Sequence, residues 1–489
     1  MLALIYRLKE ALLIKMALYK SLMNRYISKI LGILIFFSFI EVQAKDNCTP
    51  EFELAKPTSI IQSANTEDNE KSVFIYFDQS LSMQGYTKNQ PGQNNLYVNV
   101  IDDLQQIAEN VGSKTYYHSF GKSIVPIKEN KISQVIKPSF YECTSSAADC
   151  NNQESKIHLP FKMAKTNPNG TYIIVTDLFL SSKQLVGGTL SQLTKPLKSI
   201  LKKGKSVGII GVMSSFNGTI YDIPTMEGGT VSYTEAQKRP FYIIVIGDQK
   251  EINQVKKNLE EQHFTDAEDS YKYTLITSTP ILQNLNDKKL ISESNISSKV
   301  TKAENFKFDY IKETLPVYKF NIRNKSKSIK FSINKDDIIV KGSNGVSKFR
   351  IENTLWSSKK DKCSKINEDD WKKDRRVDIS KSSGGLTRSS EKKLDISMFS
   401  TVPLKKMFWG RKYFYLIDIY AEKPGNASEE TFKEWSIRDS DSEEFTAGNP
   451  VEFKTLNLTK IMKILNSVAN DEFQPTLIAS LALNFNLLK

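Results

Sequence analysis

The sequence predicts an α/β protein with a doubly wound, Rossmann-type sheet, followed by a β-rich domain. Three observations support this. Apolar strand-like segments alternate with amphipathic helical segments up to about residue 285. From about residue 300 the strands follow one another without helices. The chain has 489 residues with 39% hydrophobic residues, which is enough for two or three globular domains.

The first domain is expected over residues 71–285. Its first strand covers 72–77, where an apolar run ends abruptly at Asp78. Apolar residues from Leu96 to Val111 then recur at helical spacing, and Gly112 ends that helix. The later elements are strands at 115–120, 171–176, 206–212, 241–246 and 273–276, and helices around 190–201 and 252–259. Such alternation is typical of a parallel sheet with helices on both faces.

The second domain is expected over residues 300–455. Val317–Ile322 alternates apolar and polar residues, and so does Ile329–Ile333, as half-buried strands do. Strands without intervening helices favour a β-sandwich. The charged, Ser- and Gly-rich segment 357–395 reads as a long loop, and residues 456–489 as C-terminal helices covering Leu456–Val468 and Pro475–Leu488.

The N-terminus has the pattern of an export signal. Ile30–Ile40 is an apolar run of 11 residues with basic residues before it, and Val42-Gln43-Ala44 is a small-residue cleavage site. Residues 1–44 would be the signal peptide and residues 45–70 a polar leader. The segment is long for a signal, so Met16 or Met23 is an alternative start, and an uncleaved segment would anchor the protein. We expect export to the periplasm, the cell surface or the medium.

The four cysteines all follow the signal, and an even number in an exported chain favours disulfides. Cys143 and Cys150 enclose a short polar loop and form the preferred pair, which leaves Cys48 with Cys363. No C-x-x-C motif occurs and the chain has only 3 His residues, which argues against zinc and against His-based metal catalysis.

The net charge of +13 includes +4 from the first 44 residues, where six basic residues face two acidic ones, and leaves +9 for the rest. A basic surface favours anionic partners. Solubility and a Lys-rich composition explain the same charge more simply, so no specific nucleic-acid binding is inferred.

The segment that carries the most chemistry is Asp78-x-Ser80-x-Ser82. A carboxylate and two hydroxyls at the end of a strand form a cluster of hard oxygen ligands, which suits Mg²⁺, Mn²⁺ or Ca²⁺. Thr171–Thr176 is again an apolar strand, and it ends in Asp177. Because ligands of doubly wound sheets bind at the carboxyl ends of strands, both Asp residues are expected at one edge.

This pattern resembles the metal-ion-dependent adhesion site of von Willebrand factor type A (vWA) domains, over roughly residues 70–280. The resemblance implies that Ser80 and Ser82 bind the ion directly, and that Asp78 and Asp177 bind it directly or through water. It also implies an open position on the ion for the carboxylate of a partner. The family usually has Gly after the second Asp, where this chain has Leu178.

The family takes a further ligand from a later loop, and here several residues qualify. Ser155 is slightly favoured because it precedes Ile157 and Phe161, possible inward residues of a short helix. Thr144 and Ser145 are alternatives, and Thr144 lies between the two close cysteines.

These features predict an exported, non-enzymatic, bacterial-type binding or adhesion protein that uses a divalent metal to engage an acidic group on a protein or surface partner. One alternative is a metal-dependent hydrolase acting on a phosphorylated or glycan substrate, although no general base is evident near Asp78. Another is a metal-free envelope scaffold, in which Asp78 caps the following turn and the serines bind loop amides. Contact with the membrane is expected only through an uncleaved N-terminal segment.

Overall fold

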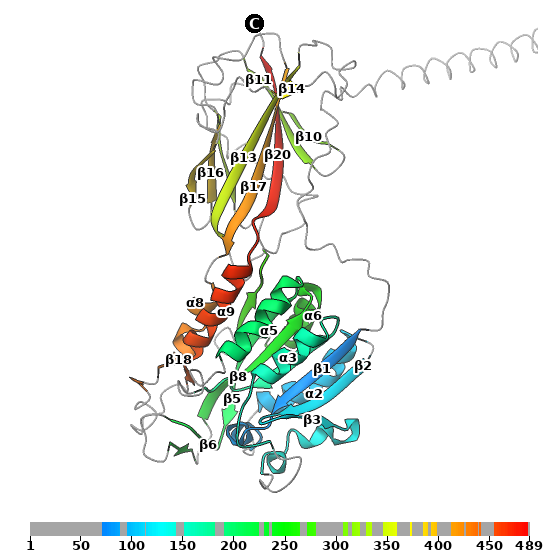
Figure 1. Cartoon of the computed structure of the whole chain (residues 1–489), viewed down its shortest axis with the longest axis vertical. Coiled ribbons are helices and arrows are strands. Elements are labelled where there is room, and N and C mark those ends of the chain that lie inside the picture. The colour runs from blue at the N-terminus through cyan, green and yellow to red at the C-terminus, as the bar shows by residue number, and fades with distance from the viewer. Residues whose placement is uncertain are drawn as a thin grey trace, which may run out of the picture.

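The computed structural model describes an α/β unit and a β-rich unit (Figure 1). The described residues are 71–88, 95–112, 114–142, 151–180, 190–223, 229–233, 237–264, 271–279, 307–311, 315–322, 329–334, 346–358, 372–373, 385–389, 393–398, 412–424, 427–438, 440–441 and 454–487. The expected signal peptide and leader lie outside these ranges. All four cysteines, and with them the predicted disulfides, lie outside as well. No helix within them is long and apolar enough to cross a membrane.

The α/β unit is built on a seven-stranded sheet with the order β3-β2-β1-β4-β8-β5-β9. The strands are β1 (Ser72–Asp78), β2 (Lys114–Phe120), β3 (Ile124–Ile127), β4 (Thr171–Thr176), β5 (Ser206–Phe216), β8 (Gln237–Gly247) and β9 (Tyr271–Ile276). Strand β1 pairs in parallel with β2 and with β4. The carboxyl ends of β1 and β4 therefore lie at the same edge, as the sequence predicted.

The prediction of a parallel sheet is wrong for its second half, because the sheet is mixed. Strands β5 and β8 form an antiparallel hairpin, and β8 lies antiparallel to β4 as well. An apolar run predicts a buried strand but not its direction. The segment 217–236 between these strands does indicate a hairpin. It contains the turn residues Gly218, Pro224 and Gly228-Gly229 and lacks the helical spacing of a crossover helix between parallel strands. Its short strands β6 (Thr219–Ile220) and β7 (Val231–Ser232) pair with each other.

Two helix layers cover the sheet. Helices α2 (Leu96–Glu109) and α6 (Gln249–His263) pack on one face through a core that includes Leu104 and Val255. Helices α3 (His158–Thr166), α5 (Leu190–Lys202) and α9 (Leu458–Glu472) pack on the other through a core that includes Leu197 and Leu465. Figure 1 shows α9, in red, beside the green α5, so the far end of the chain completes this layer.

Further residues from the second half of the chain join the α/β unit. They belong to α8 (Ala427–Thr431), η9 (Lys433–Trp435), β18 (Ser436–Ile437) and β19 (Thr455–Leu456). Phe432 and Trp435 are buried in the same core cluster as Ile209 of β5. The hydroxyl groups of Tyr242 and Thr455 lie 2.8 Å apart. The α/β core is therefore assembled from two separate stretches of sequence.

The β-rich unit contains two sheets among its described strands. The six-stranded sheet has the order β10-β11-β20-β17-β13-β14 and the three-stranded sheet the order β12-β16-β15. Their bounds are β10 (Lys307–Ile311), β11 (Leu315–Ile322), β12 (Ile329–Asn334), β13 (Val346–Ser358), β14 (Lys372–Lys373), β15 (Gly385–Ser389), β16 (Lys393–Met398), β17 (Lys412–Pro424) and β20 (Thr476–Leu487). Strands β14 and β15 fall within the segment expected to be a long loop.

The expected C-terminal helices form only in part. The first corresponds to α9, but the second is wrong: Thr476–Leu487 is β20, a central strand that pairs with β11 and β17. Its residues from Leu477 to Leu483 are buried without a break, as both faces of the strand are covered. Such a continuous apolar run cannot be distinguished from a buried helix by periodicity.

Candidate metal site

The candidate site lies at the carboxyl edge shared by β1 and β4. Asp78 ends β1 with a fully buried side chain. Its Oδ2 accepts hydrogen bonds from the hydroxyls of Ser155, at 2.6 Å, and Thr176, at 2.7 Å. Its Oδ1 accepts one from the backbone N–H of Ser80 at 2.9 Å. The structure thus brings the favoured third-loop residue, Ser155, to Asp78 across 77 positions of sequence.

Ser80 and Ser82 lie beside this carboxylate, at the start of η1 (Leu81–Tyr86). Their hydroxyl oxygens are 3.2 Å apart. Ser80 is only 8% exposed, whereas Ser82 and Ser155 are half-buried. The side chains of Ser82 and Ser155 therefore lie nearer to the solvent than the fully buried carboxylate of Asp78.

Loop-to-loop hydrogen bonds hold Ser155 in place. The N–H of Leu81 donates to the carbonyl of Asn152 at 3.0 Å, and the N–H of Lys156 donates to that of Gly121 at 3.2 Å. Gly121 is needed for this close approach, because a Cβ there would lie 1.9 Å from the carbonyl oxygen of Asn151. The loops after β1, after β2 and before α3 are thereby joined into one rim.

Asp177 is placed at the same edge but is already paired. Its Oδ2 lies 2.9 Å from Nη2 of Arg239, and both side chains are buried, at 2% and 1% exposed. Its Oδ1 accepts from the N–H of Phe179 at 3.2 Å. The resemblance predicted a carboxylate free to serve an ion, whereas the structure gives Asp177 a cation from the protein itself.

Sequence reasoning missed Arg239. This residue lies in the first half of β8, which reaches the carboxyl edge because β8 runs antiparallel to β4. The sequence does show a basic residue just before the apolar run Phe241–Ile246. Only the direction of the strand reveals that this residue lies at the carboxyl edge.

An aromatic cage surrounds the Arg239 guanidinium. Its central carbon lies 4.7 Å from the ring centre of Phe216, 5.2 Å from that of Phe179 and 5.6 Å from that of Tyr86. These distances are typical of cation–π contacts. Within the part of the chain that the structure describes, its Nε and Nη1 atoms have no hydrogen-bond partner. The rings and Asp177 are therefore the described groups that compensate the buried charge.

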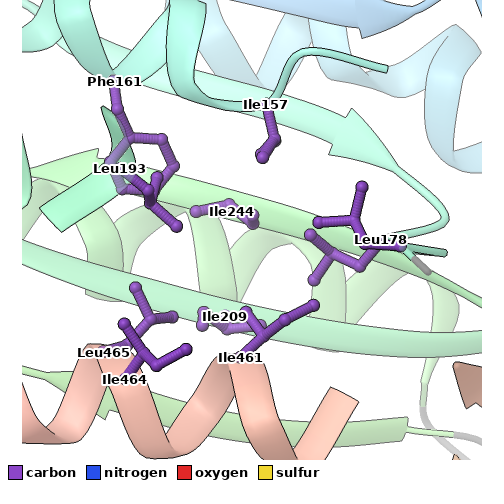
Figure 2. Close-up of a pocket in the computed structure, with 10 residues that line it drawn as sticks. Ile157, Phe161, Leu178, Leu193, Ile209, Ile244, Ile461, Ile464 and Leu465 are labelled. Carbon is purple, nitrogen blue, oxygen red and sulfur yellow. The ribbon is translucent and has the colours of Figure 1, made fainter. Parts of the chain in front are cut away.

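Leu178 occupies the position where the vWA family usually has Gly. Its φ is +49°, in the left-handed region that Gly adopts without cost. Its side chain is buried and faces a small apolar cavity between the sheet and α9, with Ile157, Ile209 and Ile461 (Figure 2). The site thus keeps the backbone conformation of a Gly but anchors it with a leucine side chain.

Burial and, to a smaller extent, the nearby negative charge of Asp177 together raise the pKa of Asp78 to about 6. Hydrogen bonds from Ser155, Thr176 and the Ser80 N–H oppose this shift. With both carboxylates ionised and Arg239 protonated, the three groups carry one net negative charge. A cation would compensate it.

The donor set fits a hard cation better than a soft one. In the described residues no group of three or more His, Cys, Asp or Glu side chains is arranged to hold a metal. Any ion here would depend on the hydroxyls of Ser80, Ser82 and Ser155 together with Asp78, and neutral oxygen ligands suit Mg²⁺, Mn²⁺ or Ca²⁺. The alternatives Thr144 and Ser145 lie outside the described residues.

Neither a protein-family model nor a curated protein matches this chain. The function of this site must therefore be inferred from its geometry.

Proposed function

We propose that this chain is an exported binding protein in which a vWA-like domain holds a divalent cation and engages an acidic group on a protein or surface partner. The observation that carries this proposal is the convergence of Ser80, Ser82 and Ser155 around the buried carboxylate of Asp78. These residues come from two loops far apart in sequence, and they are four of the five ligands that the vWA resemblance implies. The fifth, Asp177, is paired with Arg239. The cation would be Mg²⁺, or else Mn²⁺ or Ca²⁺.

Each residue has a defined part in this proposal. The hydroxyls of Ser80, Ser82 and Ser155 would hold the ion on the solvent side, and the buried carboxylate of Asp78 would supply negative charge. Arg239 offsets the charge of Asp177. The protein then contributes only about one negative charge, so a bound divalent ion would remain positive and attract a carboxylate.

The remaining parts of the chain have supporting roles in the proposal. The N-terminal segment would direct export to the periplasm, the cell surface or the medium. The two sheets of the β-rich unit would form a sandwich that serves as a spacer or as a second interface.

A metal-free scaffold is the second candidate, and a specific observation favours it. Arg239 already compensates Asp177, and three protein donors already satisfy Asp78. The site is therefore complete as a structural hydrogen-bond cluster. The hydrolase alternative stays a hypothesis that turnover of phosphate esters would test.

Calorimetric titration of the full chain with Mg²⁺ and Mn²⁺ separates these candidates. We expect one bound ion in the wild type, none in Asp78→Asn and much weaker binding in Ser82→Ala. Ser199→Ala makes the same hydroxyl deletion on α5, away from the site, and should bind as the wild type does. If the wild type and Asp78→Asn bind the ion equally, or if neither binds it, the metal-free scaffold becomes the better supported function. Pull-downs with and without chelator would then test whether partner capture needs the ion.

A further inference from the structure

The helix layer of α3 and α5 carries a cluster of exposed lysines. We call it the basic face, and it consists of Lys162, Lys165, Lys195, Lys198, Lys202 and Lys203. The two helices lie side by side on the sheet (Figure 1). At one end they are tied together, since Nζ of Lys203 donates to the backbone carbonyl of Lys165 at 3.1 Å. The lysines thus form one surface rather than scattered charges.

The charge is segregated between the two layers of the α/β unit. In the first layer, α3 and α5 contain five lysines and no acidic residue, and α9 adds two lysines, one Asp and one Glu. On the opposite face, α2 contains three acidic residues and no basic one, and α6 contains three lysines and three glutamates. A Lys-rich composition alone would give both layers a similar balance of basic and acidic residues. The segregation therefore points to a partner that meets the α3–α5 layer.

Most of this charge is not compensated locally. Lys198 and Lys202 share the carboxylate of Glu472, at 2.7 and 3.7 Å. Among the described residues, Lys162, Lys165 and Lys195 form no ion pair with a carboxylate. Burial is the main cause that lowers the pKa of His158 to about 4, and the positive charges of Lys162 and Lys156 add to it.

An apolar side chain stands within the basic face. Met163 lies between Lys162 and Lys165 in the sequence of α3 and is 42% exposed. Among the residues whose side-chain burial the structure describes, it is the only large hydrophobic one that is exposed. Lysines around an exposed apolar residue match the two zones of an anionic lipid surface, where phosphates lie outside the acyl chains.

We propose that the basic face docks this protein onto membranes that contain anionic phospholipids, with Met163 reaching below the head groups. The lysines extend on flexible stems over two helices, which suits a diffuse negative surface better than the fixed carboxylates of one protein partner. This contact does not need the N-terminal segment. It also leaves the carboxyl edge with Asp78 open, so docking and capture of a partner could occur together.

Vesicle co-sedimentation of the full chain tests the proposal. Binding to phosphatidylcholine vesicles containing phosphatidylglycerol should exceed binding to pure phosphatidylcholine and should fall steeply with added salt. Lys162→Gln combined with Lys195→Gln should weaken binding to the anionic vesicles about 30-fold, which corresponds to about 1 kcal/mol per lysine. The N-terminal segment is common to all variants, so the difference between them reports on the basic face.

The matched control is Lys250→Gln combined with Lys257→Gln, which removes two exposed lysines from α6 on the opposite layer. It should bind as the wild type does. Met163→Ser should weaken binding a few-fold without changing its salt dependence. Equal losses in the two double variants would overturn the proposal, since net charge alone would then explain binding. Tighter binding to soluble polyglutamate than to anionic vesicles would overturn it as well and assign the face to an acidic protein.

Discussion

Asp78 keeps its carboxylate where no water reaches it, which has a measurable consequence for stability. Its pKa in the folded protein is about 6, against 3.8 for the unfolded chain. The folded state therefore binds this proton more tightly, and the contribution of Asp78 to stability falls as the pH rises from about 4 to about 6. Above that range the buried charge is a constant cost, unless a cation compensates it.

Replacing Asp78 by Asn should remove this cost. In the presence of chelator at neutral pH, we expect Asp78→Asn to be more stable than the wild type by on the order of 2 kcal/mol. The advantage should shrink toward pH 4, where the wild-type carboxyl is protonated. The hydroxyls of Ser155 and Thr176 can accept from the new amide as well as donate. Urea unfolding at several pH values measures the difference, and a variant less stable at every pH would contradict it.

The pair of Arg239 and Asp177 should behave as one unit. Arg239→Met leaves a buried carboxylate without its cation and should cost about 3–5 kcal/mol of unfolding free energy. Adding Asp177→Leu removes that stranded charge, so the double variant should recover a large part of the loss. A double-mutant cycle from urea unfolding measures the coupling. Simple additivity of the two single effects would show that the ion pair does not form.

Leu178 allows the backbone and the side chain to be tested separately. Leu178→Ala deletes buried methyl groups beside an existing cavity and should cost about 2–5 kcal/mol. Leu178→Gly loses the same packing but is relaxed at φ +49°. We therefore expect the Leu178→Gly variant to be more stable than the Leu178→Ala variant by about 1 kcal/mol. In a helix the order of Gly and Ala is the reverse. Thermal unfolding of the two variants decides this, and the ordinary order would contradict the left-handed backbone.

Much of the site could be predicted from residues because its signals are local. Asp78, Ser80 and Ser82 follow one strand, and Asp177 ends another, so a rule about strand ends was sufficient to place them together. Ser155 depended on an expected helix start and does contact Asp78. Arg239 could not be found in this way, because its position depends on a long-range pairing of β8 with β4 that no local pattern specifies.

At the scale of elements, position and type were predicted better than direction and partner. The strands and helices between 72 and 276 were largely located, since apolar periodicity reports burial. Three features were not predicted: the β5–β8 hairpin, the identity of β20 and the docking of α9. Each depends on what packs against an apolar segment, which the segment's own sequence does not show. Leu477–Leu483 is buried on both sides, so the sequence carries no alternation to identify it as a strand.

Helix α9 should contribute to the stability of the α/β unit as an internal helix would. Ile461 is 3% exposed and packs in the same core cluster as Ile209 and Ile244. Ile461→Ala should cost about 2–5 kcal/mol in the transition that unfolds the α/β unit. Lys463→Ala, two positions later and exposed, is the control and should change stability little. Hydrogen exchange shows which unit is affected, and faster exchange confined to the β-rich strands would contradict this packing.

At the scale of the whole molecule, the α/β unit and the β-rich unit are interleaved in sequence rather than placed one after the other. The chain enters the β-rich unit after β9, returns to the α/β unit at α8 and leaves it again from α9 into β20. Only residues 473–475 separate α9 from β20. A boundary near residue 285 would therefore cut through the α/β core, because that core needs Phe432, Trp435 and the apolar face of α9.

A chain that ends at residue 285 should consequently fail to form a stable α/β unit. It would keep Asp78, Ser80, Ser82, Ser155 and Asp177 but would expose the apolar surface that α9 covers on the sheet and on α5. We expect such a fragment to bind a hydrophobic dye and to lose a cooperative thermal transition. Adding residues 427–475 back through a flexible linker should restore the transition, because it supplies the missing helix layer without the β-rich strands. A truncated chain with the same cooperative unfolding as the full protein would show that α9 is an accessory to the core and not part of it.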